Sequence, residues 1–588
     1  MPFTQPTLPP VDPAEYRTRP LMDRLQVLTT FWAENGYGSP YMLHAIYIAK
    51  FLLISTLGGL LVVTLTSPHI GSILDAGTWW HEPIMYQKLI LWVAFLEVFG
   101  IGGAWGPLTG HFKPFYGGAR YFSRPGLLRM APWPDKVPLT GGVRRTPVDA
   151  ALYLGYLASL IVALALPGVH YGDSLPHADG GVVRHGALIA PIVLLVVLGL
   201  RDKVVFLCSR GEQYLPAMLF FAFLEPHDML IAGKMLIVVV WVGAGWSKVG
   251  KHFENVVPVM VSNTPWSQKF ARRAHYRDFP NDLRPSKLAK LMAHVGGTTA
   301  EIIVPLILLF TTNWTVTLCG VVFMVCFHAF ITSTFPLAVP LEWNILFGFI
   351  AVALFAGYPN GDGYGIFDFS EPWMLPVIAF GLLFFPVLGN LRPDLVSFLP
   401  SMRQYAGNWA SALWTFAPGA DEKLKRAGMP VGLHREQLAA LGIEKDVAAI
   451  NIDLFVAWRS MHSQGRGLLS VLRTYLGDDA LDRRDVWEGE TGANLLLGWN
   501  FGDGHIHGIR FLEALRESCG FEPGEFVVAW VESQPVHKNF QEWFVFDGAL
   551  GVVQRGTWKV ADCVAEQPWL PNGPIPLDVT WNAAGAAS

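Results

Sequence analysis

Charged residues are scarce in this chain. Asp, Glu, Lys and Arg make up 15% of its 588 residues, 52% are hydrophobic, and the mean hydropathy is +0.35. Soluble globular proteins usually contain about 25% charged residues. The formal net charge is −4 and no Lys/Arg-rich run is present. The composition therefore excludes the basic surface of a nucleic-acid-binding protein, and we expect no nucleic-acid partner.

Cysteine is also rare. The five cysteines include no Cys-x-x-Cys pair, which argues against a disulfide framework or a zinc finger. Three of them lie in or beside apolar segments, where a cysteine usually behaves as a small hydrophobic residue. Only Cys519 and Cys563 remain as candidates for a disulfide.

The N-terminus lacks the early apolar core of a secretory signal. Residues 1–40 are rich in proline and carry acidic and basic side chains before any apolar run. A signal peptide would place its apolar core directly after its first basic residues. We expect insertion to depend on the first full membrane span, and we assign residues 1–41 to an N-terminal arm.

Long apolar runs dominate the rest of the chain. A helix needs about 20 mostly apolar residues to cross the hydrocarbon core of a bilayer. The candidate spans are residues 44–65, 85–105, 148–167, 187–208, 229–246, 292–310, 316–335, 342–356 and 373–388. Residues 215–224 are a weaker candidate, either half of a broken helix or an interfacial segment. We predict an all-α polytopic membrane bundle of about eight to ten segments over residues 42–392.

Basic residues favour one orientation. They are frequent in the N-terminal arm and in residues 113–145, whereas residues 67–83 contain no Lys or Arg. The positive-inside rule therefore predicts a cytoplasmic N-terminus. Residues 201–210 and 248–290 are basic as well. Either residues 215–224 contribute a crossing between these two segments, or one of the segments lies on the opposite side.

The character of the chain changes beyond Arg392. Charged residues become frequent, and no apolar run is long enough to span a bilayer. Residues 421–479 have helical patterning, whereas residues 525–531, 542–546 and 551–560 are rich in Val, Phe and Trp, which is typical of strands. We predict a soluble α/β domain over residues 393–588.

Three ionisable residues in apolar surroundings are the best functional candidates. A charge in a span costs at least about 2.5–3.5 kcal/mol and is retained where it faces the bundle interior, a partner or a cavity. Lys248 follows small residues at 243–247 that permit close helix packing, and a desolvated lysine can act as a base. Glu301 and His328 lie deep in the next two spans. Alternatively, Lys248 extends to the interface, and Glu301 and His328 belong to a structural polar network.

Asp503, His505 and His507 are candidate metal ligands in the C-terminal domain. In a strand, the two histidines would share one face. Two imidazoles with a nearby carboxylate suit a metal ion. The alternative is a glycine-rich turn in which the histidines are incidental.

Residues 244–249, Ala-Gly-Trp-Ser-Lys-Val, resemble the signature of the vitamin K-dependent γ-carboxylase superfamily, which includes the HTTM (horizontally transferred transmembrane) proteins. The resemblance covers about residues 215–356. It implies that Lys248 is a base that deprotonates a quinol, with Glu301 and His328 on the following family helices. The lysine pair usual in the carboxylase is replaced by Ser247 and Lys248, and its substrate-binding domain has no clear match, so protein glutamate carboxylation is not expected.

The whole chain looks closer to a bacterial family of transmembrane proteins known as domain of unknown function 3556. This resemblance includes residues 403–409 (Arg-Gln-Tyr-Ala-Gly-Asn-Trp), 461–466 and 498–507. It implies a multi-pass protein of the bacterial inner membrane and supplies no activity.

One main hypothesis and two alternatives follow. The main hypothesis is a carboxylase/HTTM-like membrane enzyme in which Lys248, Glu301 and His328 act on a quinone-like or lipidic substrate. The first alternative is a lipid or ion carrier or channel lined by Glu97, Glu301 and His328. The second is a membrane scaffold that binds protein partners through its C-terminal domain. Membrane lipids are the expected partners, and the cofactor stays open between a quinone, a lipid and a metal.

Overall fold

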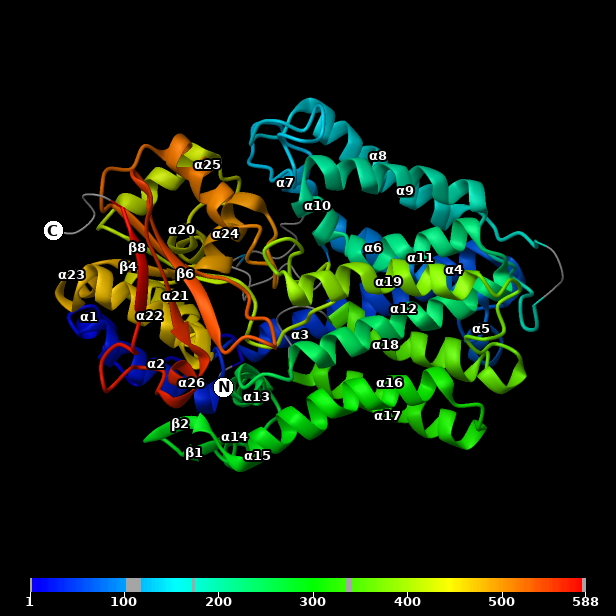
Figure 1. Cartoon of the computed structure of the whole chain (residues 1–588), viewed down its shortest axis with the longest axis horizontal. Helices are drawn as coiled ribbons and strands as arrows, with labels where there is room; N and C mark the ends of the chain where they lie inside the picture. The colour runs from blue at the N-terminus through cyan, green and yellow to red at the C-terminus, as the bar shows by residue number, and fades with distance from the viewer. Residues whose placement is uncertain (1–2, 102–110, 112–117, 172–174, 335–340, 584–588) are drawn as a thin grey trace.

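The computed structural model describes residues 3–101, 111, 118–171, 175–334 and 341–583. It consists of a bundle of long helices and, at one end of this bundle, a domain that contains a β-sheet (Figure 1). The helices of the bundle run roughly along the longest axis of the molecule. The N-terminus lies at the same end as the sheet domain.

Among the described residues, seven helices of the bundle are long and apolar enough to cross a membrane. They are Tyr41–Thr66 (α3, η1, α4), Pro147–Ala165 (α8), Pro226–Ser247 (α12), Lys287–Phe310 (α15, η4, α16), Trp314–Thr334 (α17), Trp343–Asp362 (in α18, η5 and η6) and Met374–Leu391 (α19). Shorter helices accompany them, namely α6 (Pro83–Phe99), α9 (His185–Arg201) and α11 (Gly211–Phe223). These helices agree with the predicted all-α membrane bundle.

The predicted span at residues 187–208 is wrong at its C-terminal end. Helix α9 stops at Arg201, and a separate helix, α10 (Lys203–Cys208), begins after Asp202. The Asp202 carboxylate accepts a hydrogen bond from the Val204 amide at 3.1 Å and pairs with Arg145 at 2.8 Å. An aspartate at this position caps a new helix, so the apolar run is divided between two helices.

Helices α11 and α12 form a hairpin that places two basic segments at the same end. Before the hairpin, the Lys203 ammonium donates to the His505 carbonyl oxygen at 2.8 Å. After it, the Asn408 amide donates to the Ser247 carbonyl oxygen at 3.1 Å. Both ends of the hairpin therefore lie against the C-terminal domain. Most of the residues 215–224 thus lie in α11, which runs along the bundle between the two basic segments, in agreement with the alternative in which they contribute a crossing.

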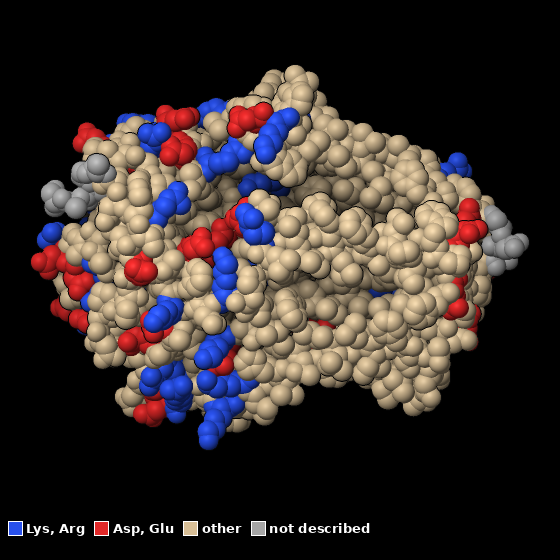
Figure 2. Space-filling view, viewed as in Figure 1, with Lys and Arg blue, Asp and Glu red and all other residues tan. Residues whose placement is uncertain are grey.

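Charged side chains mark the two ends of the bundle. Figure 2 shows Lys, Arg, Asp and Glu gathered over the C-terminal domain and at the opposite tip, with a broad band almost free of charge between them on this face. Loops 67–82, 311–313 and 357–373, which contact one another at the opposite tip, contain no Lys or Arg. An uncharged band between charged ends is typical of a bundle surrounded by lipid.

Short elements connect the bundle to the C-terminal domain. They are α7 (Gly118–Phe122), α13 (His252–Asn263), α14 (Lys269–Arg273), β1 (Tyr276–Asp278) and β2 (Asp282–Pro285). Strands β1 and β2 pair as an antiparallel hairpin. The last four of these elements separate α12 from the next membrane helix and lie near the C-terminal domain (Figure 1).

The C-terminal domain contains a six-stranded antiparallel sheet with the order β4-β3-β5-β6-β7-β8. The strands are β3 (Ser411–Phe416), β4 (Asp485–Glu488), β5 (Phe526–Val531), β6 (Phe540–Asp547), β7 (Gly551–Lys559) and β8 (Asp578–Asn582). Strands β5 to β7 match the three predicted positions. Because an α/β domain has mainly parallel strands joined by helices, the predicted class is corrected to α+β.

Helices of the C-terminal domain pack on this sheet, and the N-terminal arm packs on one of them. Helix α22 (Ser463–Leu476) contacts β3 and β5, and α25 (Ile509–Cys519) contacts β7. Helix α2 (Leu21–Asn35) lies along α21 (Lys445–Met461). Helix α2 of the N-terminal arm therefore packs against the C-terminal domain.

A buried polar contact holds the arm in place. The Arg24 guanidinium and the Tyr16 hydroxyl both donate to one carboxylate oxygen of Asp453, at 2.6 and 2.7 Å. Arg24 is 1% exposed, so its charge needs this counter-charge. The apolar face of α2 is buried in the same contact, which explains why the arm docks rather than remaining in solvent.

Candidate functional site

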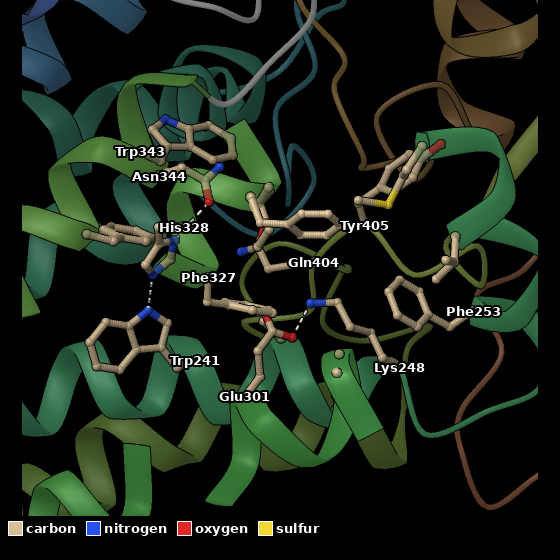
Figure 3. A pocket seen from close by; sticks show the side chains of 18 of the residues that line it. Trp241, Lys248, Phe253, Glu301, Phe327, His328, Trp343, Asn344, Gln404 and Tyr405 are labelled. Carbon is tan, nitrogen blue, oxygen red and sulfur yellow. Dashed lines mark hydrogen bonds and ion pairs between the residues drawn. The ribbon is translucent and has the colours of Figure 1, made fainter. Parts of the chain in front are cut away.

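A cavity of about 460 Å³ lies where α12, α16 (Ala300–Phe310), α17 and α18 (Leu341–Ala351) approach the C-terminal domain. Most of its walls are apolar and aromatic. Its most polar side chains are those of Lys248, Glu301, His328, Asn344, Gln404 and Tyr405. Figure 3 shows Lys248 and Glu301 facing each other on one side, and His328 together with Trp241 and Asn344 on the other.

Lys248 and Glu301 form an ion pair on the cavity wall. The Lys248 ammonium donates a hydrogen bond to a carboxylate oxygen of Glu301. Both residues are buried, with 7% and 3% of their surface exposed. The Lys248 carbonyl oxygen also accepts a hydrogen bond from the Thr298 hydroxyl at 3.0 Å. The C-terminal end of α12 is therefore tied to the next helix by both main chain and side chain.

A glycine one turn before the lysine permits this contact. A Cβ atom added to Gly245 would lie 2.8 Å from Ile302 Cγ1 and 3.0 Å from the Cβ atom of Glu301. Such distances are too short for a larger residue, whereas glycine lets two helices approach closely. The close packing expected for residues 243–247 is thus present, and it brings Lys248 within reach of α16.

Each member of the buried ion pair depends on the other to compensate its charge. Removing a charge from water costs several kcal/mol, and Coulomb attraction offsets this cost only when the geometry is good. Deleting one partner of a buried pair costs about 3–5 kcal/mol, because the other charge is left without compensation. A proton can also pass along the hydrogen bond between Lys248 and Glu301, which converts two charged groups into two neutral ones.

His328 lines the same cavity but has partners of its own. The Trp241 indole N–H donates to His328 Nε2 at 2.9 Å, and His328 Nδ1 lies 2.9 Å from the side-chain oxygen of Asn344. Because an indole N–H can only donate, Nε2 is the acceptor and Nδ1 carries the proton. His328 is therefore held as a neutral imidazole between two helices and is not a member of the ion pair.

One wall of the cavity faces the outside of the bundle. Phe323 and Phe330 on α17 line the cavity and are 41% and 44% exposed. Cys326 on the same helix and Gly296 in η4 (Met292–Thr299) are exposed as well. These positions belong to helices that are apolar enough to span a membrane. The outer surface beside the cavity therefore suits contact with lipid rather than with water.

The C-terminal domain closes one side of the cavity, and the sequence did not predict this contact. Gln404 and Tyr405 line it, and the Tyr405 hydroxyl donates to His462 Nε2 at 2.7 Å. His462 Nδ1 in turn donates to the Trp458 carbonyl oxygen at 2.8 Å. Burial lowers the pKa of His462 to about 3, so its neutral imidazole can accept from Tyr405. In the sequence, residues 403–409 were noted only as part of a family resemblance. No sequence pattern indicated that they lie close to Lys248.

The predicted metal site receives no support from the geometry. Its segment forms turns instead of the strand in which the histidines would share a face. His505 pairs with Glu532 at 2.7 Å and with Asp503 at 3.6 Å, whereas His507 contacts the Asn500 amide. In the described part of the chain, no group of three His, Cys, Asp or Glu side chains is placed to hold a metal.

The charge of His505 is also unfavourable for metal binding. Burial lowers the pKa of His505, but attraction by Glu532 and hydrogen bonding to Asp503 outweigh this effect and raise the pKa to about 10. The imidazole is therefore a cation at neutral pH. A metal ligand has to be a neutral imidazole.

The fold and the cavity define a multi-pass membrane protein in which a C-terminal domain covers a buried lysine–glutamate pair. The family model described as "transmembrane protein of unknown function (DUF3556)" matches residues 1–580. The chain belongs to this family of transmembrane proteins. No curated protein and no protein of known structure matches the chain. The HTTM and carboxylase resemblance thus stays a prediction from short motifs.

Proposed function

We propose that the chain is a membrane enzyme that binds a lipid-soluble molecule with an acidic hydroxyl group, such as a quinol, in the Lys248 cavity. The observation that carries this proposal is the buried Lys248–Glu301 pair on the wall of a mostly apolar cavity. An apolar cavity that borders on a lipid-facing surface suits a ligand that arrives through the bilayer. The few convergent polar groups would orient the ligand's polar end.

The proposed chemistry is removal of a proton from the bound hydroxyl. Lys248 first transfers its own proton to Glu301 along their hydrogen bond, which leaves a neutral amine and a neutral carboxylic acid. The amine then accepts the hydroxyl proton, so that the ligand becomes an oxyanion beside the new Lys248 ammonium. A general base has to lie within hydrogen-bond reach of the proton that it removes, and Lys248 faces the cavity as this requires (Figure 3).

His328 has a positioning role in this proposal. Its two ring nitrogens are already occupied by Trp241 and Asn344. Substitution of His328 would therefore disturb the cavity wall rather than remove a proton carrier. This differs from the hypothesis in which His328 relays protons together with Glu301.

The test uses decylubiquinol, a short-chain quinol, with the full-length protein in phosphatidylcholine nanodiscs under anaerobic conditions. The ultraviolet spectrum of the bound quinol should change to that of the quinolate at a lower pH than for the free quinol. Lys248→Met should keep the fold and lose this spectral change, because the base is absent. The exposed neighbour Lys251 supplies the matched control, Lys251→Met, which should behave like the unsubstituted protein. Absence of binding, or an unchanged spectrum in Lys248→Met, would overturn the proposal.

A carrier or channel has less support. That hypothesis placed Glu97, Glu301 and His328 along one pathway, but Glu97 is not among the residues that line the cavity. A scaffold function leaves the covering of the cavity by Gln404 and Tyr405 without a purpose. The enzyme proposal uses both the charged pair and the domain that closes over it.

We place this enzyme in a bacterial cell membrane, with its N-terminus and C-terminal domain in the cytoplasm. Support comes from the basic segments 201–210 and 248–290, which lie at the end of the bundle that carries the C-terminal domain. A green fluorescent protein fused to the C-terminus should fluoresce in cells, and an alkaline phosphatase fused there should be inactive. The reverse pattern would place this domain outside the cytoplasm.

A further inference from the structure

A second cavity, of about 440 Å³, lies between the sheet of the C-terminal domain and the helical bundle. On the bundle side it is lined by Met130, Ala131, Lys203 and Asp394. On the domain side it is lined by residues of the 505–510 segment and of strands β5 to β7. None of the described residues lines both this cavity and the Lys248 cavity. Figure 2 shows basic and acidic side chains gathered along this boundary between domain and bundle.

The carboxylates of the second cavity are already neutralised. Glu532 pairs with His505 at 2.7 Å. Asp394, at the end of α19, pairs with Arg392 at 2.6 Å. Glu542 on β6 lies 3.4 Å from the ammonium of a neighbouring lysine. None of these carboxylates therefore requires a further cation from the cavity.

Three cations of the same cavity have no such partner. Lys203 donates to the His505 carbonyl oxygen at 2.8 Å, and Arg510 donates to the Ala131 carbonyl oxygen at 2.6 Å. The guanidinium of Arg555 lies 5.8 Å from the centre of a phenylalanine ring. Within the described ranges, none of the three forms an ion pair, so positive charge is in excess around the cavity.

Burial disfavours the charged forms of two of these cations. Burial lowers the pKa of Lys203; attraction by Asp503 opposes this effect, and the smaller repulsion by Arg510 adds to it. Burial also lowers the pKa of Arg510, against attraction from Asp135. An anion between these side chains would relieve the repulsion and restore their favourable charged forms.

A helix end adds to the attraction for an anion. Helix α25 begins at Ile509, and no side chain caps its N-terminus at Gly508. Gly508 and Ile509 both line the cavity. The first amides of a helix point out along its axis with a partial positive charge, which favours bound anions.

We propose that this cavity binds a phosphate-type oxyanion through Lys203, Arg510 and Arg555. Two guanidinium groups and an ammonium suit the several oxygen atoms of a phosphate better than a single donor would. The cavity lies at the end of the uncharged band, beside the ends of α9 and α19. The phosphate can therefore belong to free phosphate or to the headgroup of an anionic phospholipid.

The test measures the binding of free phosphate and of a phospholipid headgroup to the full-length protein in two separate experiments. Inorganic phosphate is titrated by calorimetry into protein in phosphatidylcholine nanodiscs. Separately, protein is purified from nanodiscs that contain phosphatidylglycerol, and retained phosphatidylglycerol is counted by native mass spectrometry. Arg555→Gln and the double variant Lys203→Gln with Arg510→Gln should each weaken binding at least about tenfold. Arg516→Gln is the matched control, because Arg516 lies on the same helix as Arg510 and pairs with Glu513.

Each outcome decides the proposal. Phosphate binding that both cavity variants weaken supports a site for free phosphate. Retention of phosphatidylglycerol that the same variants abolish supports a headgroup site. If neither probe binds, or if the cavity variants bind as well as Arg516→Gln, the proposed site does not exist. The Arg555 side chain is exposed on β7, so its variant tests binding without endangering the fold.

Discussion

The Lys248–Glu301 pair offers a quantitative test of the site through a double-mutant cycle. The variants are Lys248→Met, Glu301→Gln and the combination of both. Each single substitution removes one member of a buried pair whose other member stays in the cavity wall. The combined substitution removes both charges, so that no uncompensated charge is left between the helices.

The expected magnitudes follow from the burial of both groups. A single substitution should lower the free energy of unfolding by about 3–5 kcal/mol. The combined variant should lose less than the sum of the two single effects, with a coupling energy of about 2–3 kcal/mol. Lys251→Met, which changes an exposed lysine three residues along the chain, should stay within about 0.5 kcal/mol of the original protein.

The assay is denaturation in mixed micelles followed by circular dichroism, with the same denaturant dependence expected for all variants. Effects of the two single variants that add within about 0.5 kcal/mol would refute the reasoning, because independent sites are additive. Such a result would mean that each charge is satisfied separately. The proposed proton transfer between Lys248 and Glu301 would then lose its basis.

Two further predictions concern the C-terminal domain. Asp453→Ala should destabilise the C-terminal domain by about 3–5 kcal/mol and release the N-terminal arm, because Arg24 and Tyr16 lose their shared acceptor. Limited digestion with trypsin should then cut within the arm. An arm that stays uncut would contradict this prediction. Folding raises the pKa of His505 from 6.5 to about 10, so its stabilisation is complete below pH 6.5 and is lost as the pH rises through 10. The denaturation midpoint should decrease from pH 6 to pH 8 to pH 10, and the Glu532→Gln variant should show a smaller decrease. A midpoint that does not change with pH in the unsubstituted protein would show that folding does not raise the pKa of His505.

The sequence selected three side chains that line one cavity, but it did not predict the contacts between them. Lys248, Glu301 and His328 were selected because each lies in apolar surroundings, and all three line one cavity. Only two of them form a pair, since His328 is held by Trp241 and Asn344. Which polar groups bond to each other depends on the rotation and depth of whole helices. A pattern within one helix does not contain that information.

The metal prediction illustrates a different limit. It assumed that the segment around His505 is a strand, in which alternate side chains share a face. The chain instead turns at these residues, and Glu532, from the end of β5, provides the counter-charge. A partner from a distant strand thus decides whether a histidine is a cation or a possible ligand.

By itself, the sequence determined that this is a helical membrane protein with a C-terminal domain of different character. The reason is that a bilayer imposes about 20 apolar residues on each spanning helix, a requirement that local composition displays directly. Only the tertiary structure decided that Lys248 contacts Glu301, which lies 53 positions away in the sequence. It also decided that Gln404 lines the cavity. The carbonyl oxygen of Gln404 contacts Ser247, which lies 157 positions away. Contacts over such separations result from the packing of the complete bundle against the C-terminal domain, which no local pattern specifies.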